Sequence, residues 1–388
     1  MENLKIFIIA GEISGDLLAS EIIKNLQITY KHNLTIKGIA GKHLKKQGVT
    51  TLFPQEELSI MGFFEVIPAI PRIIKRINDT VRAIISFKPN IVITVDSPDF
   101  NFRVIKKLTR LKFNTSKFIH IVAPTVWAYR EKRAKKVSQL YDLLLVLLPF
   151  EPPYFTKYGL NTKFIGHPII YKNFVSPKQD VLKKYNINNN DNIITLTLGS
   201  RTKEIKQLST IYKAALKKLS HTNNNIVIII PTFTKYIDFF NSWVKDLPFN
   251  TIITTDESEK LAFFKISDFV IAKSGTNTIE IAKQETAFMV CYKVSMLTYL
   301  LLKFIVKTKY VNLLNIFANK EIVPEYIQYQ CTADNIYNQA KKYLNNQDLV
   351  KSQIKKQNQY IKKFLNNHNT DPAIMATTEI LAQINRHC

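Results

Sequence analysis

The chain has 388 residues, of which 46% are hydrophobic and 22% are charged, as is ordinary for two globular domains of roughly 150 to 200 residues each. Its formal net charge of +24 predicts attraction to polyanions such as nucleic acid, an anionic bilayer or a phosphorylated substrate, although a compositional drift towards Lys, Asn and Ile would give the same excess. The cysteines lie far apart at Cys291, Cys331 and Cys388, which argues against a zinc site or a disulfide framework and fits a reducing cytoplasm. No charge-free apolar run reaches the roughly 18 residues of a membrane-spanning helix, and the run Ile6 to Ala10 is too short for a signal peptide.

Short β-branched runs alternate along the chain with longer helical patterns. The first series of predicted strands is KIFIIA, LTIKGIA, PNIVITVD, KFIHIVA and DLLLVLL, and the second is NIITLTLG, NNIVIII, NTIITT, DFVIAKSG and AFMVCY. Helices are predicted between them, among others at 15–26, 203–219 and 276–284. Strands that are apolar on both faces and separated by helices predict parallel sheets covered on both sides.

The segment FIGHPIIYKNFVSPKQD, which carries two prolines and a glycine, separates the two series. We therefore predict an α/β fold of two Rossmann-like, doubly wound domains that face each other across a cleft, at residues 1–165 and 175–340. The tail, 341–388, is predicted to be helical and to pack back towards the first domain. Because ligands of open parallel sheets bind at the carboxyl ends of the strands, the residues that follow these ends are the candidate site residues.

The first of these strand ends reads AGEISGD. A dinucleotide-binding turn needs G-x-G-x-x-G, but here Glu12 would push a carboxylate towards the pyrophosphate. One interpretation is an ordinary strand–helix turn with Ser14 as N-cap and Asp16 complementing the helix dipole. The other is that Glu12 and Ser14 hold the hydroxyl groups of a sugar.

The second strand end reads VDSPDF. Asp96 ends an apolar strand, and Pro98 makes the following turn rigid. A carboxylate at the mouth of a buried strand is a candidate general base, because partial desolvation raises its proton affinity. Asp99 is better suited to capping the next helix.

The third strand end reads APTVWAYREKRAKK. It combines a stiff aromatic loop containing Trp127 with a basic cluster that includes Arg130 and Arg133. A solvated basic face is one interpretation. The other is a site for a phosphate or an anionic membrane surface, with Trp127 at the interface.

The second series carries two loops suited to anions. LGSRTKE places Gly199, Ser200 and Arg201 between a strand and a helix, where backbone amides and a guanidinium suit a diphosphate. KSGTNTIE places Ser274, Gly275 and Thr276 before a helix, and Glu280 could accept hydrogen bonds from a ribose diol. Two anion loops in one domain and a base in the other suggest a group transferase with a nucleoside diphosphate leaving group.

Nine motifs of the chain resemble, in order and spacing, those of the lipid-A-disaccharide synthase family. They are AGEISGD, MGFFEVIP, DSPDFN, APTVWAYREKR, LPFE, FIGHP, LGSRTKEI, KSGTNTIE and KTKYVNLLNIFANKEIVPE, between Ile6 and about Glu325. Leu198 and Leu314 stand where the family usually has proline, and Ala123 and Tyr129 also depart from its pattern.

The resemblance implies the glycosyltransferase B fold and one step of lipid A assembly. A donor, UDP-2,3-diacylglucosamine, would pass its sugar to the 6-hydroxyl of 2,3-diacylglucosamine 1-phosphate with inversion, giving a β-1,6-linked disaccharide 1-phosphate and UDP. Asp96 would be the base, with Glu12 and Ser14 at the sugars. The donor would be held by Gly199, Ser200, Arg201, Ser274, Gly275, Thr276, Glu280 and Asn315. No metal and no other cofactor is expected, because Arg201 and backbone amides would hold the leaving UDP.

Acylated substrates require an apolar surface, and LSIMGFFEVIPAIPRIIKRI is a candidate for it. Its Met61, Phe63 and Phe64, flanked by the basic Arg72, Lys75 and Arg76, suit a peripheral membrane helix. A buried amphipathic helix is the alternative. With Trp127, Arg130 and Arg133, these residues would serve the acceptor and the cytoplasmic leaflet of the inner membrane. The protein would then be cytoplasmic and peripheral, and it could form a homodimer.

Two other functions remain open from the sequence. A UDP-N-acetylglucosamine epimerase or another UDP-sugar transferase would share the loops of the second domain but not DSPDFN or the apolar stripe. A nucleic-acid-binding protein would explain the charge, but the chain carries no RNP, zinc-finger or helix-turn-helix signature, so no nucleic-acid partner is expected.

Overall fold

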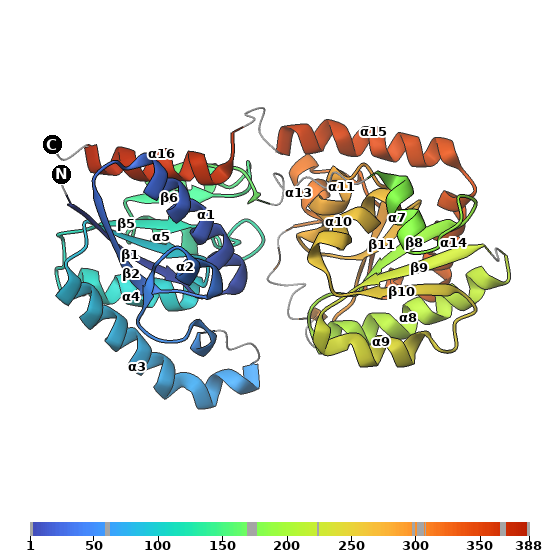
Figure 1. Ribbon diagram of the computed structural model, residues 1–388, viewed down its shortest axis with the longest axis horizontal. Coiled ribbons are helices and arrows are strands. Elements are labelled where there is room, and N and C mark those ends of the chain that lie inside the picture. Colours follow the sequence, from blue (N-terminus) through green and yellow to red (C-terminus); the bar gives the residue numbers. More distant parts are fainter. Residues whose placement is uncertain are drawn as a thin grey trace. The chain divides into compact units, whose positions relative to one another are not determined.

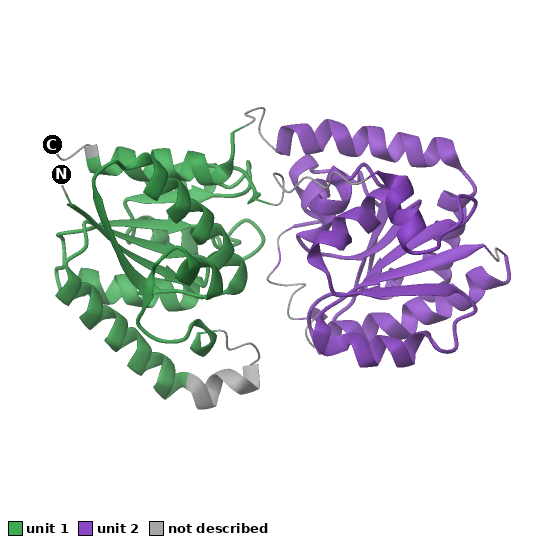
Figure 2. Cartoon of the chain, in the orientation of Figure 1, with its two compact units in different colours: residues 1–168, 368–388 green, residues 169–367 purple. Residues whose placement is uncertain are grey.

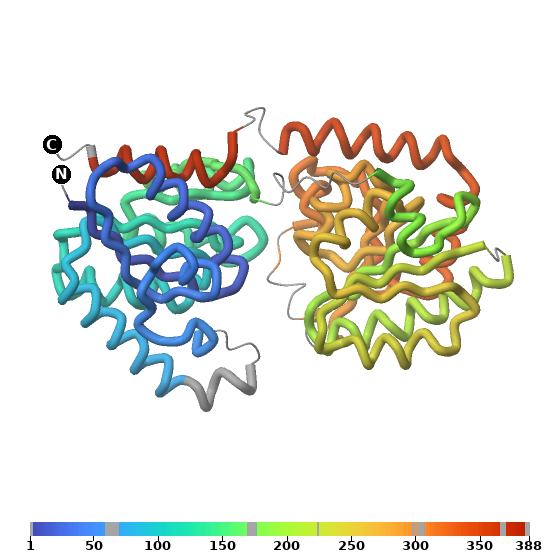
Figure 3. The backbone as a smooth tube through the Cα atoms, viewed as in Figure 1, coloured from blue at the N-terminus to red at the C-terminus, as the bar shows by residue number. Residues whose placement is uncertain are grey.

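A computed structural model describes residues 3–58, 63–168, 177–222, 225–296, 299–300, 306, 308–364 and 370–385, with side chains described from residue 70 onward in the helix that begins at Phe63. The chain divides into two compact units (Figure 2). Unit 1 comprises Met1–Pro168 and His368–Cys388, and unit 2 comprises Ile169–Asn367. Figure 3 shows the backbone of each unit coloured along the sequence.

Unit 1 is built on a parallel sheet of seven strands in the order β3-β2-β1-β4-β5-β6-β7 (Figure 1). The strands are β1 (Asn3–Ala10), β2 (Asn33–Ile39), β3 (Thr50–Thr51), β4 (Ile91–Val95), β5 (Lys117–Ile121), β6 (Leu143–Val146) and β7 (Asn161–Phe164). The helices are α1 (Ile13–Thr29), α2 (Lys42–Lys46), α3 (Phe63–Phe87), α4 (Pro98–Arg110), α5 (Arg133–Ser138), α6 (Pro152–Thr156) and α16 (Pro372–Asn385), with a 3-10 turn η1 (Gln55–Glu57). The chain reverses its direction of winding between β1 and β4.

Unit 2 repeats this plan with six parallel strands in the order β10-β9-β8-β11-β12-β13. The strands are β8 (Asn192–Thr197), β9 (Ile226–Pro231), β10 (Asn250–Thr254), β11 (Phe269–Lys273), β12 (Phe288–Tyr292) and β13 (Glu325–Ile327). The helices are α7 (Lys178–Lys184), α8 (Thr202–Ser220), α9 (Ile237–Val244), α10 (Glu257–Ile266), α11 (Asn277–Lys283), α13 (Leu313–Ala318), α14 (Ala333–Leu344) and α15 (Gln347–Phe364), with 3-10 turns η3 (Thr234–Tyr236) and η4 (Gln328–Gln330). Here the winding reverses between β8 and β11.

Both faces of each sheet are buried, which confirms the predicted α/β class. In β1, Ile6 and Ile8 pack with the core of one face, which includes Leu18 of α1, whereas Phe7 pairs with the core of the other face, which includes Val104 of α4. Burying each such side chain stabilises the fold by about 1.5–3 kcal/mol. The predicted helices 15–26, 203–219 and 276–284 correspond to α1, α8 and α11. The short strands β3, β7 and β13 were not predicted from the sequence.

The C-terminal tail is divided between the units. In α15, Gln353 and Gln357 donate to the carbonyls of Phe288 and Thr286, so this helix packs within unit 2. In α16, Ala376 and Ile380 join the core that contains α1 of unit 1. The packing against the first domain that we expected for the whole tail therefore applies to α16, because the apolar and amide groups of α15 find their partners on unit 2.

Candidate functional site

The winding of the chain reverses once in each sheet, and each reversal marks a candidate binding site at the carboxyl edge of that sheet. In doubly wound sheets, ligands bind outside the carboxyl ends of the two strands between which the winding reverses. In unit 1 these strands are β1 and β4, where Ala10 is in register with Val95. In unit 2 they are β8 and β11, where Thr197 is in register with Ala272. The predicted residues Glu12 and Asp96 follow the first pair, and the Gly199 and Ser274 loops follow the second.

Asp96 lies in a strained turn directly after β4. Asp96 and Ser97 both have left-handed backbone conformations, with φ of 52° and 41°. Such strain costs of order 1–3 kcal/mol per residue and persists only where the surroundings fix it. Here the amide of Asp96 donates to the carbonyl of Ile121, and the side-chain amide of Asn101 donates to the carbonyl of Asp96. The turn therefore holds the Asp96 carboxylate in one place at the edge of the sheet.

The carboxylate of Asp96 is half-buried and has a raised proton affinity. Burial raises its pKa above the usual aspartate value, and the hydrogen bond from the Ser97 amide, 2.9 Å long, partly offsets this. Asp99 is the less suitable base, because its exposed carboxylate is engaged with Arg133 at 2.7 Å. Of Asp96 and Asp99, Asp96 is thus the one without an ion pair in the described structure, and burial raises its proton affinity.

The glycines of AGEISGD make room for the Asp96 turn. A Cβ atom at Gly11 would lie 2.3 Å from Ser97 Oγ, and one at Gly15 would lie 3.6 Å from Asp96 Cβ. Gly11 therefore allows the turn after β1 to approach the turn after β4, a role that requires no phosphate. Gln55 secures the same turn, because its side-chain amide donates to the carbonyls of Ala10 and Glu12.

Two expectations for this segment require correction. Helix α1 begins at Ile13 with Glu12 as its N-cap residue, so Ser14 lies in the first turn and is exposed. Asp16 is buried and accepts hydrogen bonds from the amides of Gly41, His43 and Leu44. Its carboxylate therefore caps α2 rather than complementing the dipole of its own helix.

The aromatic loop after β5 is anchored within unit 1. The indole of Trp127 donates to Glu151 at 3.2 Å, and its ring contacts Phe150 edge-on. Burial raises the pKa of Glu151 to about 8. Arg133 has a mostly buried side chain and stacks on Phe102, while Arg130 is exposed. Trp127 and Arg133 thus have partners inside the unit, which leaves Arg130 as the exposed member of the expected surface group.

The basic stripe of α3 is also partly occupied. Arg76 makes a bidentate ion pair with Glu57 at 2.7 and 2.8 Å and stacks over Phe53, so its guanidinium fixes the helix to the unit. Arg72 and Lys75 are exposed, beside Ile70 and Ile74 with exposed fractions of 44% and 48%. Met61 and the side chains of Phe63 and Phe64 lie outside the described residues.

Unit 2 contains a pocket of about 290 Å³ at the carboxyl edge of its sheet, near the lower end of the range for small-molecule sites. The lining comes from the ends of four strands and the turns after them: Thr197 to Ser200 at β8, Pro231 to Phe233 at β9, Thr254 to Glu257 at β10, and Lys273 to Asn277 at β11. Lys260 and Glu280 complete it. Six of the eight predicted donor-binding residues therefore line one pocket, namely Gly199, Ser200, Ser274, Gly275, Thr276 and Glu280.

The charged groups of this pocket are arranged in pairs. Glu280 is buried and lies 3.0 Å from the ammonium of Lys260, which is also 2.8 Å from Glu257. Lys273 lies 3.0 Å from Glu204, whose same oxygen is 3.7 Å from Arg201. Gly199 has φ of 104°, and a Cβ there would lie 2.6 Å from Glu204. Only a residue without a side chain fits this turn, which brings backbone and cations together at the pocket.

Arg201 and Asn315, the other two predicted donor-binding residues, do not line this pocket. Arg201 is the exposed N-cap residue of α8, beside the pocket. Asn315 is fully buried: its amide nitrogen donates to the carbonyl of Val323 and to Glu325, and its oxygen accepts from the amides of Ile322 and Val323. Since all four of its hydrogen-bonding positions are used inside the protein, Asn315 shapes the loop after α13 and has none left for a donor.

Sequence reasoning missed several residues of the pocket. Phe233, with an exposed fraction of 46%, offers a ring at its rim, and Lys260 and Lys273 supply cations. Lys273 directly precedes Ser274 in a motif that was recognised, so its position next to the anion loop was an available signal. Phe233 and Lys260 belong to no motif and become visible only through the fold.

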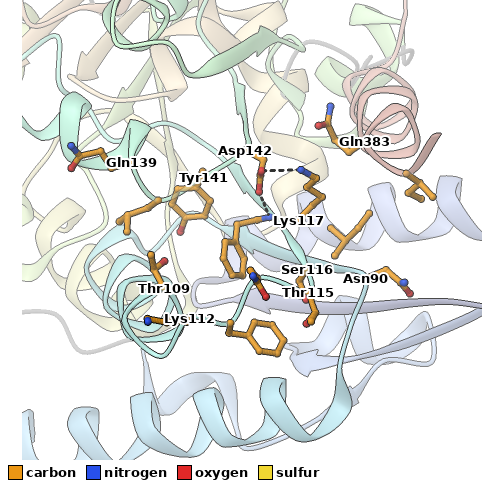
Figure 4. Close-up of a pocket in the computed structure, with 16 residues that line it drawn as sticks. Asn90, Thr109, Lys112, Thr115, Ser116, Lys117, Gln139, Tyr141, Asp142 and Gln383 are labelled. Carbon is orange, nitrogen blue, oxygen red and sulfur yellow. Dashed lines mark hydrogen bonds and ion pairs between the residues drawn. The ribbon is translucent and has the colours of Figure 1, made fainter. Parts of the chain in front are cut away.

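A second pocket, of about 410 Å³, lies at the opposite, amino edge of the sheet of unit 1 (Figure 4). It is lined by the segments that precede β4, β5 and β6, and Lys117 and Asp142 form an ion pair of 3.3 Å there. None of the predicted site residues lines it. Among the described residues, no group of three His, Cys, Asp or Glu side chains could hold a metal ion, and no helix is long and apolar enough to cross a membrane.

Solved structures with the same fold include sugar-nucleotide enzymes. UDP-N-acetylglucosamine 2-epimerase from Neisseria meningitidis, bound to UDP-GlcNAc, matches 99% of this chain and 100% of its own with a TM-score of 0.60 at 12% identity. MurG from Acinetobacter baumannii matches 98% of this chain and 99% of its own with a TM-score of 0.57 at 15% identity. The fold is accordingly of the glycosyltransferase B type, as expected.

Comparison with protein families and curated sequences identifies the family. The model of the lipid-A-disaccharide synthetase family (LpxB) matches residues 6–383. The lipid-A-disaccharide synthase of Rickettsia bellii (strain OSU 85-389) is 41% identical over 376 residues, which span 96% of this chain and 97% of the relative. That of Rickettsia prowazekii (strain Madrid E) is 38% identical over 374 residues, with the same coverage. The chain therefore belongs to the lipid-A-disaccharide synthetase family of glycosyltransferases.

Proposed function

We propose that this enzyme transfers 2,3-diacylglucosamine from UDP-2,3-diacylglucosamine to the 6-hydroxyl of 2,3-diacylglucosamine 1-phosphate. The products are the β-1,6-linked disaccharide 1-phosphate and UDP. The observation that carries the proposal is the complementary chemistry at the two sheet edges: a carboxyl group of raised pKa at β4, and a pocket with cations and a buried carboxylate between β8 and β11.

Unit 2 binds the UDP part of the donor. Glu280 accepts hydrogen bonds from the ribose diol, and its ion pair with Lys260, 3.0 Å long, orients the carboxylate for this. The backbone around Gly199 and the Ser274 to Thr276 loop supply amide and hydroxyl donors for the diphosphate, next to Arg201. The exposed ring of Phe233 provides an apolar face for the uracil base.

Unit 1 activates the acceptor. Asp96 accepts the proton of the 6-hydroxyl as that oxygen attacks the anomeric carbon, and the bond between this carbon and the β-phosphate oxygen breaks with inversion. The electron pair of that bond leaves with UDP. Glu12 and the exposed Ser14 lie on the turn that packs against the Asp96 turn, where we place the hydroxyl groups of the sugars. Donors aimed at the departing diphosphate lower the barrier without a metal ion or other cofactor.

The acyl chains give the exposed stripe of α3 a role. Ile70 and Ile74 offer apolar surface beside the exposed cations Arg72 and Lys75, which suits attachment to the anionic cytoplasmic face of a membrane. The enzyme would thus collect its lipid substrates as a peripheral protein. Replacing Arg72 and Lys75 with glutamate should reduce sedimentation with anionic vesicles and leave UDP affinity unchanged; equal sedimentation would contradict this attachment.

The test of the reaction is to incubate the purified protein with both lipids. We expect UDP and a disaccharide phosphate to appear together in equal amounts, and neither to appear when the acceptor is omitted. Full recovery of donor and acceptor would refute the proposal. Conversion of UDP-N-acetylglucosamine to its 2-epimer would instead assign the chain the activity of its structural neighbours.

A further inference from the structure

We propose that Lys273 is a direct ligand of the donor diphosphate, to which its ammonium group passes from Glu204. The proposal rests on the proposed function, because it assumes a UDP-sugar in the pocket of unit 2. In the site predicted from the sequence, Arg201 was the only cationic side chain expected to bind the diphosphate; Lys273 is added to it here.

The position of Lys273 follows from the register of the sheet. It is the last residue of β11, and its amide donates to Thr197 Oγ1 at the end of β8. Its side chain runs beneath the Gly199 turn, since its Cδ would lie 3.5 Å from a Cβ at Gly199. Lys273 therefore lines the pocket from between the two anion loops, whereas Arg201 lies outside the lining.

The charges around Lys273 leave its ammonium available to an anion. Its side chain has an exposed fraction of 19%, and its nitrogen lies 3.0 Å from Glu204 Oε1 and over the ring of Tyr292. The same carboxylate oxygen also has Arg201 within 3.7 Å, so Glu204 remains paired when Lys273 turns to a phosphate. Lys260, by contrast, lies between the carboxylates of Glu257 and Glu280. Of the two lysines that line the described pocket, Lys273 is paired with a single carboxylate, that of Glu204, and this carboxylate also has Arg201 nearby.

Glu204 is placed to prepare this exchange. Its second oxygen is buried without a hydrogen-bond partner among the described residues, directly beneath Gly199. A carboxylate there would repel a diphosphate unless a cation offset its charge, and the ammonium of Lys273 lies 3.0 Å from this carboxylate. In this role Lys273 stabilises the charge that gathers on the β-phosphate oxygen when the bond to the anomeric carbon breaks, and it transfers no proton.

Two explanations of a Lys273 effect must be separated by experiment. In the first, Lys273 contacts the phosphates; in the second, it only neutralises Glu204. Isothermal titration of UDP should therefore be carried out on the wild type, Lys273→Met, Glu204→Gln and the double variant. Lys265→Met is the matched control, because Lys265 forms a Lys–Glu pair of 3.7 Å with Glu285 away from this pocket.

For direct contact, we expect Lys273→Met to weaken UDP binding by roughly 10-fold to 100-fold, the usual contribution of a hydrogen bond to a charged group. Affinity for uridine, which lacks phosphates, should not change, and Lys265→Met should bind UDP like the wild type. The double variant, which leaves no unpaired Glu204 carboxylate, should remain weaker than Glu204→Gln by a similar factor. That comparison decides the question even if the single variant Lys273→Met fails to fold.

Restoration of wild-type UDP affinity in the double variant would refute direct contact and leave Lys273 as a neutralising residue. Equal loss of uridine and UDP binding would also refute it. If the wild type fails to bind UDP, the proposed function itself is overturned. If the wild type binds UDP and Lys273→Met binds it equally well, only the role of Lys273 is refuted.

Discussion

The two sheet edges at which the winding reverses share one backbone plan and differ in charge. In unit 1, the turn after β4 presents Asp96, whose pKa is governed by burial and by the neighbouring Ser97 amide. In unit 2, the turns after β8 and β11 present Lys273 and Arg201, and the nearby carboxylates Glu204 and Glu280 are each paired with a lysine. The same fold thus presents a carboxyl group of raised pKa in one unit and a group of cations in the other.

This difference indicates that the strand–turn–helix frame does not by itself determine which ligand a sheet edge binds. A side chain at either glycine would meet a neighbour, Ser97 at Gly11 and Glu204 at Gly199, and Gly199 also has a left-handed backbone. The ligand is selected by the side chains that those close approaches bring to the edge. Substitutions in the two units should accordingly separate chemistry from nucleotide binding.

The largest effect is expected from Asp96→Asn. The amide of asparagine cannot act as a base towards the 6-hydroxyl group of the acceptor substrate, so turnover should fall by roughly 10²-fold or more. Product formation under saturating substrates measures this. Asp99→Asn is the matched control: it removes an exposed carboxylate three residues away that pairs with Arg133, and turnover should change little. An equal loss in both variants would show that the base is not uniquely Asp96.

The next largest effect should appear in unit 2. Glu280→Ala removes the carboxylate proposed for the ribose diol and leaves Lys260 with Glu257, so UDP should bind roughly 10-fold to 100-fold more weakly. Isothermal titration provides the affinity. Glu12→Gln, the corresponding change in unit 1, should leave UDP affinity intact while lowering turnover. A large loss of UDP binding in Glu12→Gln would indicate that the nucleotide contacts unit 1, contrary to the proposal.

Much of the fold was predictable, because strands that are apolar on both faces and alternate with helices permit few arrangements. The motifs also located Asp96 and six lining residues of the pocket. What remained hidden depends on contacts between distant segments. No local pattern shows that Gly11 must accommodate Ser97, that Asp16 caps α2, or that Glu57 holds Arg76. Nor does a local pattern show that the side chain of Asn315 is hydrogen-bonded to Val323, Glu325 and Ile322, because these contacts exist only in the folded loop.

Two glycine variants should have effects of intermediate size, one on turnover and the other on UDP affinity. Gly11→Ala forces Ser97 away and displaces Asp96, so turnover should fall with UDP affinity unchanged. Gly199→Ala meets Glu204 and adopts a left-handed backbone that costs an alanine about 1–2 kcal/mol, so UDP affinity should fall. Turnover and titration on both variants provide the comparison. The double variant Gly11→Ala/Ser97→Gly should recover part of the turnover; no recovery would contradict the steric explanation.

The smallest effect concerns pH. Because burial raises the pKa of Asp96, the acid limb of kcat/KM should lie above the usual aspartate range, with activity increasing as pH rises through it and Asp96 loses its proton. UDP affinity of unit 2 should not follow this limb. A pH profile of kcat/KM beside a pH series of UDP titrations tests both statements, and an acid limb that persists unchanged in the residual activity of Asp96→Asn would assign it to another group.

The central claim is that unit 1 supplies the base and unit 2 holds the nucleotide. Its most direct test is the UDP dissociation constant of the same Asp96→Asn preparation whose turnover has been measured. We expect a constant within about twofold of the wild type, a difference of less than 0.5 kcal/mol, together with the loss of product formation. A loss of UDP affinity that matches the loss of turnover would contradict the division of roles between the two units.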